Sequence, residues 1–336
     1  MFSFLARSEF LKRLASEYGM TPHGFARRFI AGETVNEAIE AARTLQGRGM
    51  HVALDYLGES VSTTKAAASA SREYVHLIET IVGSGIERNI SLKLTQLGLT
   101  IDKATCVDNL RRILEPARRH EFFVRIDMEN SPFTQLTIEV FETLWSLEFR
   151  NIGIALQSSL HRTEQDVRRM NELGARVRLV KGAYKEPVAV AFQQKADVDA
   201  AYMRQMRLLL DHGVYPAIAT HDEHIINETR SYAAERKIGS DRFEFQMLYG
   251  IRRDLQTSLV AGGYRMRVYI PFGKSGSRTS CVVSASGRRM SVSSFARCLA
   301  KSRADRKVKG QMPCHHVFRP AFHCQGSAYR ADHSPC

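Results

Sequence analysis

Residues 176–184, RVRLVKGAY, place an apolar strand directly before a Lys-Gly-Ala turn and an aromatic ring. A strand that ends in this way presents a positive charge, free backbone N–H groups and a ring at one place. Such groups are suited to holding an anionic cofactor or substrate. The same pattern also occurs as a buried strand followed by an ordinary turn, so the surrounding elements must decide between the two interpretations.

Helical and strand-like hydrophobic patterns alternate around this stretch. Thr34 and Glu37 form a capping box, and a helical face then runs to Gly47. A later helical pattern is predicted to open with Ser131 as N-cap and Pro132 at the first helical position. Another helical face carries Ile251, Leu255 and Leu259 and stops at Gly262 and Gly263. Between such segments we predict eight strands, at residues 51–57, 90–94, 122–128, 151–157, 176–181, 215–220, 242–247 and 266–271.

Parallel strands separated by helices are typical of an α/β protein, and eight of them favour a (β/α)₈ barrel of the TIM type. A doubly wound open sheet is the alternative, but it usually carries a glycine-rich fingerprint after its first strand, and LDYLGES is not one. We therefore predict an N-terminal helical segment at 1–50 and a barrel at 51–273. The final barrel helix is expected to be lost or replaced in an aberrant basic, disordered tail at 274–336.

Composition supports this division of the 336 residues. With 44% apolar and 25% charged residues the chain is expected to be globular, and without a membrane-spanning run or a signal peptide it is expected to be cytoplasmic. The net charge of +13 would ordinarily suggest nucleic acid or an anionic membrane surface as a partner. However, twelve of the 48 Lys and Arg residues but only two of the 35 acidic residues lie from Lys274 onward, as do five of the six cysteines.

Polar and aromatic side chains stand at the ends of most predicted strands. In a barrel these ends meet at one mouth, where functional groups gather. A metal site is disfavoured because only the stretch THDEH brings histidines to this mouth. Nucleophilic hydrolysis is disfavoured as well, because no Ser or Cys stands at a strand end beside a plausible base. The polar and aromatic side chains at the strand ends are better suited to binding a phosphorylated cofactor with a heteroaromatic ring. The set comprises Lys93, Thr95, Gln96, Asp127, Glu129, Gln157, Arg178, Lys181, Tyr184, Thr220, His221, Asp222, Gln246, Leu248, Tyr249 and Tyr269.

Seven motifs in collinear order resemble the strand motifs of the bacterial monofunctional proline dehydrogenase family. The similarity runs from about residue 27 to 273 and implies noncovalent FAD in a distorted barrel. It also implies oxidation of the CH–NH group of L-proline to 1-pyrroline-5-carboxylate, electron transfer to a membrane quinone and a peripheral contact with the inner face of the cell membrane. The motifs are ISLKLTQLG (90–98), VRIDMENS (124–131), IALQSSLHRT (154–163), RLVKGAYKEP (178–187), ATHDEHII (219–226), RFEFQMLYG (242–250) and RVYIPFG (267–273).

The resemblance also implies roles for individual residues. Asp127 and Arg178 would be catalytic, with Arg178 near the flavin ring, where a cation stabilises the reduced anion. Asp127 would orient Lys93 or favour a positive charge nearby, unless the two form a purely structural salt bridge. Proline would be bound by Lys93, Tyr184, Leu248 and Tyr269. The cofactor would be bound by Ile126, Gln157, Arg178, Lys181, Gly182, Ala183, Thr220 and His221, with no metal.

One expected feature is missing from the chain. In the family a Tyr-x-x-Arg-Arg helix followed by Glu comes shortly after IPFG and clamps the proline carboxylate. Here a Ser-rich stretch without helical periodicity follows, and Arg288-Arg289 lacks the preceding Tyr. Regrouping the codons from Ser275 by one nucleotide permits Tyr-Phe-Met-Arg-Arg and a following Glu. We therefore hypothesise that the chain is out of frame after Lys274.

Alternative functions remain open at this point. The barrel could bind flavin without turning over proline, as an inactive or degraded protein. The basic stretch at 301–310 could bind nucleic acid, although an incidental tail is the favoured interpretation and no specific nucleic acid is expected. A zinc site is disfavoured because the spacing fits no standard finger in the cluster Cys314, His315, His316, His323 and Cys324.

Overall fold

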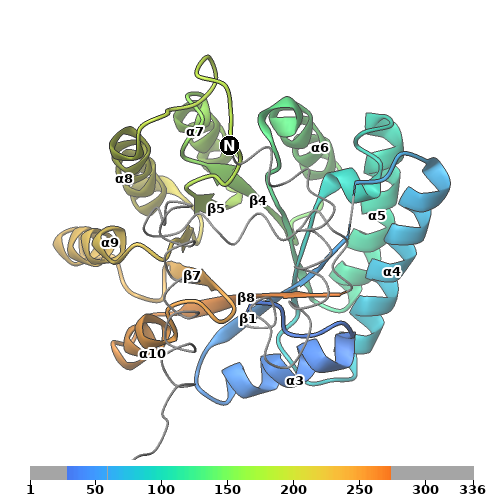
Figure 1. Cartoon of the computed structure of the whole chain (residues 1–336), viewed down its shortest axis with the longest axis horizontal. Coiled ribbons are helices and arrows are strands. Elements are labelled where there is room, and N and C mark those ends of the chain that lie inside the picture. Colours follow the sequence, from blue (N-terminus) through green and yellow to red (C-terminus); the bar gives the residue numbers. More distant parts are fainter. Residues whose placement is uncertain (1–28, 59, 274–336) are drawn as a thin grey trace, which may run out of the picture. The chain divides into compact units, whose positions relative to one another are not determined.

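The computed structural model describes residues 29–58 and 60–273, and in this part of the chain the strands form one closed barrel (Figure 1). All neighbouring strands are parallel and follow one another in chain order. The predicted (β/α)₈ barrel is therefore confirmed. The strands are β1 (His51–Tyr56), β2 (Asn89–Leu92), β3 (Phe123–Ile126), β4 (Ile152–Gln157), β5 (Arg176–Val180), β6 (Ala217–Ala219), β7 (Glu244–Leu248) and β8 (Met266–Phe272).

Closure depends on β8 lying beside β1. The two strands pair from His51 opposite Arg267 to Tyr56 opposite Phe272, which is the longest register in the sheet. A closed sheet has no exposed edge that could pair with another chain. This pairing excludes the doubly wound sheet, whose first and last strands do not meet.

Helices connect the strands and surround them in Figure 1. The predicted capping box is present, since the Thr34 side chain accepts from the Glu37 backbone and the Glu37 carboxylate reaches back to Thr34. The helix with Leu259 ends at Gly262, as predicted, although Ile251 lies just before its first turn. The helices are α3 (Val35–Gln46), α4 (Thr64–Val82), α5 (Lys103–Arg119), α6 (Thr134–Ser146), α7 (Thr163–Glu172), α8 (Lys195–His212), α9 (Glu223–Glu235) and α10 (Arg253–Ala261), with short 3₁₀ helices η2 (Leu94–Leu97) and η3 (Ser131–Phe133).

The prediction that Ser131 is an N-cap is wrong. Asn130 is the N-cap of η3, and η3 runs directly into α6. The Ser131 hydroxyl donates instead to the carboxylate of Glu186, a residue far along the chain. Pro132 does lie in the first turn, where its missing N–H is tolerated.

Side chains alternate between the two faces of each strand. On β8, Val268 and Ile270 are fully buried in the apolar layer between strands and helices. Tyr269 instead bonds Asp127, which follows β3 on the opposite side of the barrel. Because β8 and β3 are not neighbours, this bond must pass through the barrel interior. The interior is thus polar, whereas TIM barrels usually fill it with branched apolar residues.

The predictions for the tail lie outside the described residues. These comprise the lost final helix, Arg288-Arg289, the basic stretch at 301–310 and the cysteines and histidines from Cys314 onward. The three-segment division therefore stays a prediction. Within the described part, no helix is long and apolar enough to cross a membrane.

Candidate active site

The predicted site residues lie at one end of the barrel because parallel strands all end on the same side. Lys93 follows β2, Asp127 follows β3 and Tyr184 lies in the loop after β5. Arg178, Gln246 and Tyr269 lie within β5, β7 and β8 rather than at their ends, Thr95 and Gln96 lie in η2, and the other members stand at strand ends or in the segments that follow them. Direct hydrogen bonds join many of them to other mouth or interior residues, among them Lys93, Asp127, Arg178 and Tyr269.

Lys93 is paired with an acidic residue that the sequence prediction missed. Its Nζ lies 3.1 Å from both carboxylate oxygens of Asp55, which is buried in β1. Burial lowers the pKa of Lys93, but Asp55 and Asp127 outweigh this effect and the net shift is upward. Lys93 is therefore charged and has one N–H left after bonding the two oxygens.

Asp127 is hydrogen-bonded to other groups than Lys93, so of the two predicted effects the stabilisation of a nearby positive charge is the one that the geometry supports. One Asp127 oxygen accepts from Arg178 Nη1, and the other accepts from the Tyr269 hydroxyl at 2.7 Å. Burial, followed by the charges of Asp127 and Asp55, raises the pKa of Tyr269 well above its usual value. Tyr269 therefore remains protonated and acts as a donor. Asp127 still influences Lys93, but only through space.

Arg178 is almost fully buried and is held on all sides. Its Nε donates to Gln246 Oε1 at 2.6 Å and its Nη2 donates to Ser91 Oγ at 3.0 Å, in addition to the Asp127 bond. The guanidinium carbon lies 5.1 Å from the centre of the Tyr269 ring. Its position is therefore determined by four different strands or strand ends.

The bonds continue below the mouth through the barrel. Gln246 Nε2 donates to Glu244, and Glu244 accepts from Arg267 Nε at 2.8 Å and Nη2 at 3.0 Å. Arg267 also lies 2.8 Å from Glu87. Although burial alone would raise the pKa of Glu244, Arg267 outweighs it and brings the value to about 2. The floor of the site is therefore an ionised network.

A second carboxylate, Glu129, faces the mouth from the loop after β3. It accepts from Thr95 N at 3.1 Å and from Thr95 Oγ1 at 2.7 Å. Burial raises the pKa of Glu129, and the bonds from Thr95 oppose this only in part. Gln157 Nε2 donates to the backbone oxygen of Glu129 at 2.7 Å, so the ends of β3 and β4 are fixed to each other.

The Lys-Gly-Ala turn after β5 is tightly packed. Gly182 has φ of +107°, and a Cβ there would lie 2.2 Å from Ser159 Oγ and 3.3 Å from Gln157 Oε1. Lys181 contacts Asp199 at 2.5 Å and Asp222 at 2.8 Å. The turn thus lies too close to Ser159 to admit a side chain at Gly182, and the charge of Lys181 is matched by two carboxylates.

His221 is fixed in one protonation state by the strand beside it. The backbone N–H of Leu248 donates to His221 Nε2 at 2.9 Å, and only a neutral ring can accept there. Burial and then the charge of Arg252 lower the pKa of His221 to about 4. The ring therefore carries its proton on Nδ1, where it can donate. Thr220 lies directly before it and accepts from Asp222 N at 3.1 Å.

Tyr184 is exposed, like its neighbour Ala183, with 38% of its surface accessible. Burial and then the charge of Glu129 raise its pKa to about 12, so it is protonated. Ile126 is the last residue of β3, and Ala183 follows Gly182 in the turn after β5.

The residues missed by sequence reasoning are mostly inward-facing strand residues rather than strand ends. Asp55, Ser91, Glu244 and Arg267 are polar residues flanked by apolar ones. That interruption of an apolar run is the signal that could have identified them. The same interruption marks Gln246, which the sequence analysis included among the mouth residues but to which it assigned no role.

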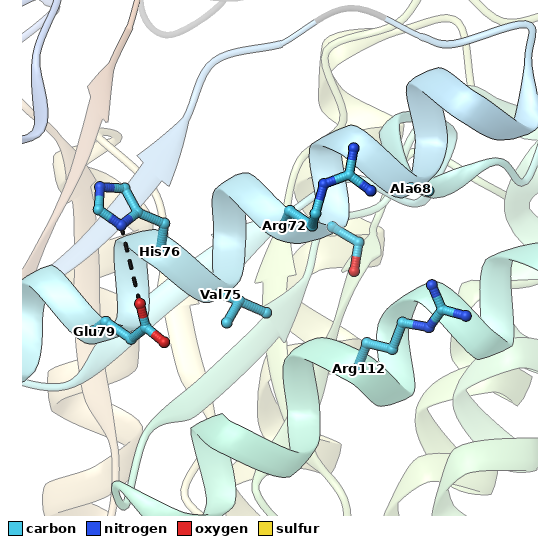
Figure 2. A pocket seen from close by; sticks show the side chains of 7 residues that line it. Ala68, Arg72, Val75, His76, Glu79 and Arg112 are labelled. Atoms are coloured by element: carbon cyan, nitrogen blue, oxygen red, sulfur yellow. Dashed lines mark ion pairs between the residues drawn. The ribbon is translucent and has the colours of Figure 1, made fainter.

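A groove between α4 and α5 is separate from this site (Figure 2). Its volume is about 270 Å³, and Figure 2 shows Arg72, Arg112 and the ion pair of His76 with Glu79, 4.0 Å apart, along it. None of the predicted site residues lines it. In the described part of the chain, His, Cys, Asp and Glu side chains also form no cluster suited to a metal ion.

Comparisons with known proteins identify a family that this chain matches. The family model described as proline dehydrogenase matches residues 38–278. The chain is 41% identical to proline dehydrogenase 2 of Bacillus subtilis over 81% of this chain and 89% of that protein. It is also 41% identical to proline dehydrogenase of Deinococcus radiodurans, over 74% and 82% of the two chains. Among solved structures it resembles proline utilization A from Bdellovibrio bacteriovorus inactivated by N-propargylglycine, with a TM-score of 0.70, 30% identity and coverage of 74% of this chain and 31% of that one.

Proposed function

Because this chain belongs to the proline dehydrogenase family, we propose that the mouth of its barrel binds L-proline against FAD through the residues described above. The resemblance drawn from the strand motifs is confirmed by the family match. The function is the oxidation of proline, and the chain is an oxidoreductase that acts on the CH–NH group. The cofactor, the acceptor and the role of each residue are parts of the proposal.

The observation that carries the proposal is the cluster of Lys93, Asp127, Arg178 and Tyr269. It joins groups from four strands into one arrangement of charges with fixed donors. Lys93 has one remaining N–H, which supports a bond to the proline carboxylate. Arg178 is held so firmly that it can present its charge with little reorganisation.

The residues present fit a flavin at its ring end. His221 has a donor at Nδ1, and Gly182 brings the backbone of the Lys-Gly-Ala turn close to Gln157 with no side chain between them. When bound, FAD supplies the hydride acceptor that these side chains lack. We assign Gln157 and His221 to hydrogen bonds with it, and Arg178 to stabilisation of negative charge that develops on the ring. Ile126, Ala183 and Thr220 are assigned to the wall around it.

Lys181 has a different place in the proposal. Its two carboxylate partners, Asp199 and Asp222, neutralise its charge. We therefore assign Lys181 to holding the Lys-Gly-Ala turn between α8 and α9, rather than to a simple attraction for phosphate. Lys195 lies 3.4 Å from Asp222 and joins the same cluster.

Proline must lose its amine proton before hydride can leave the adjacent carbon. The carboxyl group of Asp127 is bound by Arg178 and Tyr269, so its acceptor capacity is largely used in orienting these two groups. We propose that Asp127 fixes the wall against which the ring of proline lies. Leu248, Tyr184 and Tyr269 complete this wall, and the substrate amine enters in its neutral form.

The carboxylate clamp decides how active this chain is. The family match ends at residue 278, close to Lys274, where the composition changes. This supports the hypothesis that the chain is out of frame from there and lacks the paired arginines. We propose impaired turnover for this exact chain. Resequencing the gene across codon 274 tests the idea, and an uninterrupted frame for the same tail in related strains would refute it.

Transfer of electrons to a membrane quinone, a peripheral membrane contact and a cytoplasmic location also remain proposals. They are supported by the family match. Reduction of a short-chain quinone by proline, followed in the presence and absence of lipid vesicles, would test the acceptor and the contact together.

A visible spectrum followed by anaerobic titration with L-proline tests the main proposal. We expect flavin absorbance that proline bleaches, more weakly than in a chain with the frame restored. Lys93→Ala should keep the flavin and lose most of the bleaching. Lys103→Ala is the matched control, because Lys103 pairs with Glu139 on the outer helices. Absence of flavin after reconstitution with FAD would refute the cofactor assignment, and flavin without bleaching would favour the inactive barrel.

A further inference from the structure

The loop from Lys181 to Gln194, between β5 and α8, has two arms of different character (Figure 1). The returning arm is fixed by backbone bonds to the segment after β4. Phe192 N donates to Ser159 O at 2.8 Å, His161 N donates to Val190 O at 3.0 Å, and Leu160 forms a bridge with Ala191. The outgoing arm carries Tyr184 and is held in another way.

Glu186 anchors the outgoing arm. It is only 9% exposed, although Lys185 and Pro187 on either side of it are exposed and Val188 is 73% exposed. Its two carboxylate oxygens accept from Ser131, one from the backbone N–H at 2.8 Å and one from the hydroxyl at 2.5 Å. Burial of a carboxylate is costly unless it is hydrogen-bonded, and these two bonds provide that compensation.

Ser131 connects this anchor to the catalytic cluster. It lies four residues after Asp127 and two after Glu129, at the start of η3, which continues into α6. A carboxylate at the beginning of a helix is also favoured by the helix dipole. Glu186 therefore takes over the capping role expected of the Ser131 side chain, and it does so from a different loop.

We infer that Glu186 and Ser131 form a clamp that fixes Tyr184 over the mouth, and that both are positioning residues for proline binding. The clamp joins the loop after β3, which carries Asp127 and Glu129, to the loop that carries Tyr184. Without it, the outgoing arm keeps the 3.3 Å bond from Gln193 Nε2 to the backbone oxygen of Glu186 and the backbone bonds to Pro187 O, but it loses these two bonds to the loop after β3. The consequence for turnover rests on the proposed function, in which Tyr184 lies beside proline.

The first test uses hydrogen exchange in the full chain and requires no activity. In Glu186→Ala we expect exchange of the Ser131 amide and of peptides containing Tyr184 to become at least about tenfold faster, since a bond to a charged group contributes about 1.5–3 kcal/mol and 1.4 kcal/mol is tenfold. Glu186→Gln should restore part of the protection. Lys185→Ala, on the same arm, is the control and should leave exchange unchanged. Unchanged exchange at Tyr184 in Glu186→Ala would overturn the clamp.

The second test separates positioning from simple stability. In the flavin-loaded protein, Glu186→Ala and Ser131→Ala should raise the KM for proline about tenfold and change kcat by less than about twofold. The double variant should be no worse than Glu186→Ala. An unchanged KM with faster exchange would overturn the positioning role. If the parent chain takes up no flavin, the proposed function fails, whereas hydrogen exchange still decides the clamp.

Discussion

His221 should make the fold weaker as the pH falls from 6.5 towards 4. In the folded chain its ring accepts the Leu248 N–H, and burial and Arg252 lower its pKa to about 4. In the unfolded chain it returns to its ordinary value of 6.5. Between these two values the unfolded state binds one proton more than the folded state, so acidification favours unfolding and stability rises with pH.

The size of this effect follows from the two pKa values of His221. The difference between 6.5 and about 4 corresponds to about 3 kcal/mol, because one pKa unit is about 1.36 kcal/mol. At about pH 4.5 roughly 2.5 kcal/mol of this has already been lost. Urea unfolding at pH 7.5 and pH 4.5 measures it. His221→Gln should lose about 2.5 kcal/mol less than the parent chain over this interval, since glutamine can accept the same bond without titrating.

A second histidine provides the control for this experiment. His76 lies on α4 with 75% of its side chain exposed, so His76→Gln should follow the parent chain at both pH values. The comparison also removes the effect of carboxylates such as Glu244, which titrate equally in all three proteins. Equal losses of stability in His221→Gln and the parent chain would refute the neutral, acceptor state of this ring.

Three further predictions concern single groups. Tyr269→Phe removes the 2.7 Å bond to Asp127 and should lower the free energy of unfolding in urea by about 2 kcal/mol; no change would mean that the bond is not formed. Gly182→Ala combines φ of +107° with a Cβ 2.2 Å from Ser159 Oγ, so it should lower stability by at least about 1 kcal/mol and reduce FAD retention on gel filtration. Burial raises the pKa of the Cys106 thiol to about 12, so mass spectrometry should find Cys106 alkylated only after unfolding, and rapid native alkylation would contradict its buried position.

The barrel could be predicted because its signals are local and repeated. Each strand is a short apolar run, and caps such as Thr34 and Gly262 mark where helices begin or end. A helix between successive strands indicates that the strands are parallel. Parallel strands all end on one side of the barrel, which predicts where the mouth lies. For this reason residues such as Lys93 and Arg178 could be assigned to one site before their contacts were known.

The partners of these residues could not be predicted, because strand stagger and tilt determine which inward side chains meet. Lys93 pairs with Asp55 from the adjacent β1 rather than with Asp127, although Asp127 is nearer in the chain. Ser131 shows the same limit, since its sequence context indicates a local cap while a distant loop supplies the carboxylate. Local sequence patterns carry no information about such contacts between residues that are distant in the chain.

The interior network explains why the mouth depends on residues far below it. A buried charge is tolerated only while it is paired, and removal of one partner from a buried pair typically costs about 3–5 kcal/mol. Arg178 bonds Gln246, Gln246 bonds Glu244, and Glu244 is held by Arg267. Loss of Arg267 would leave Glu244 without its main cation, and the rearrangement would reach Arg178 through Gln246. The position of Arg178 is therefore a property of the whole barrel interior rather than of β5 alone.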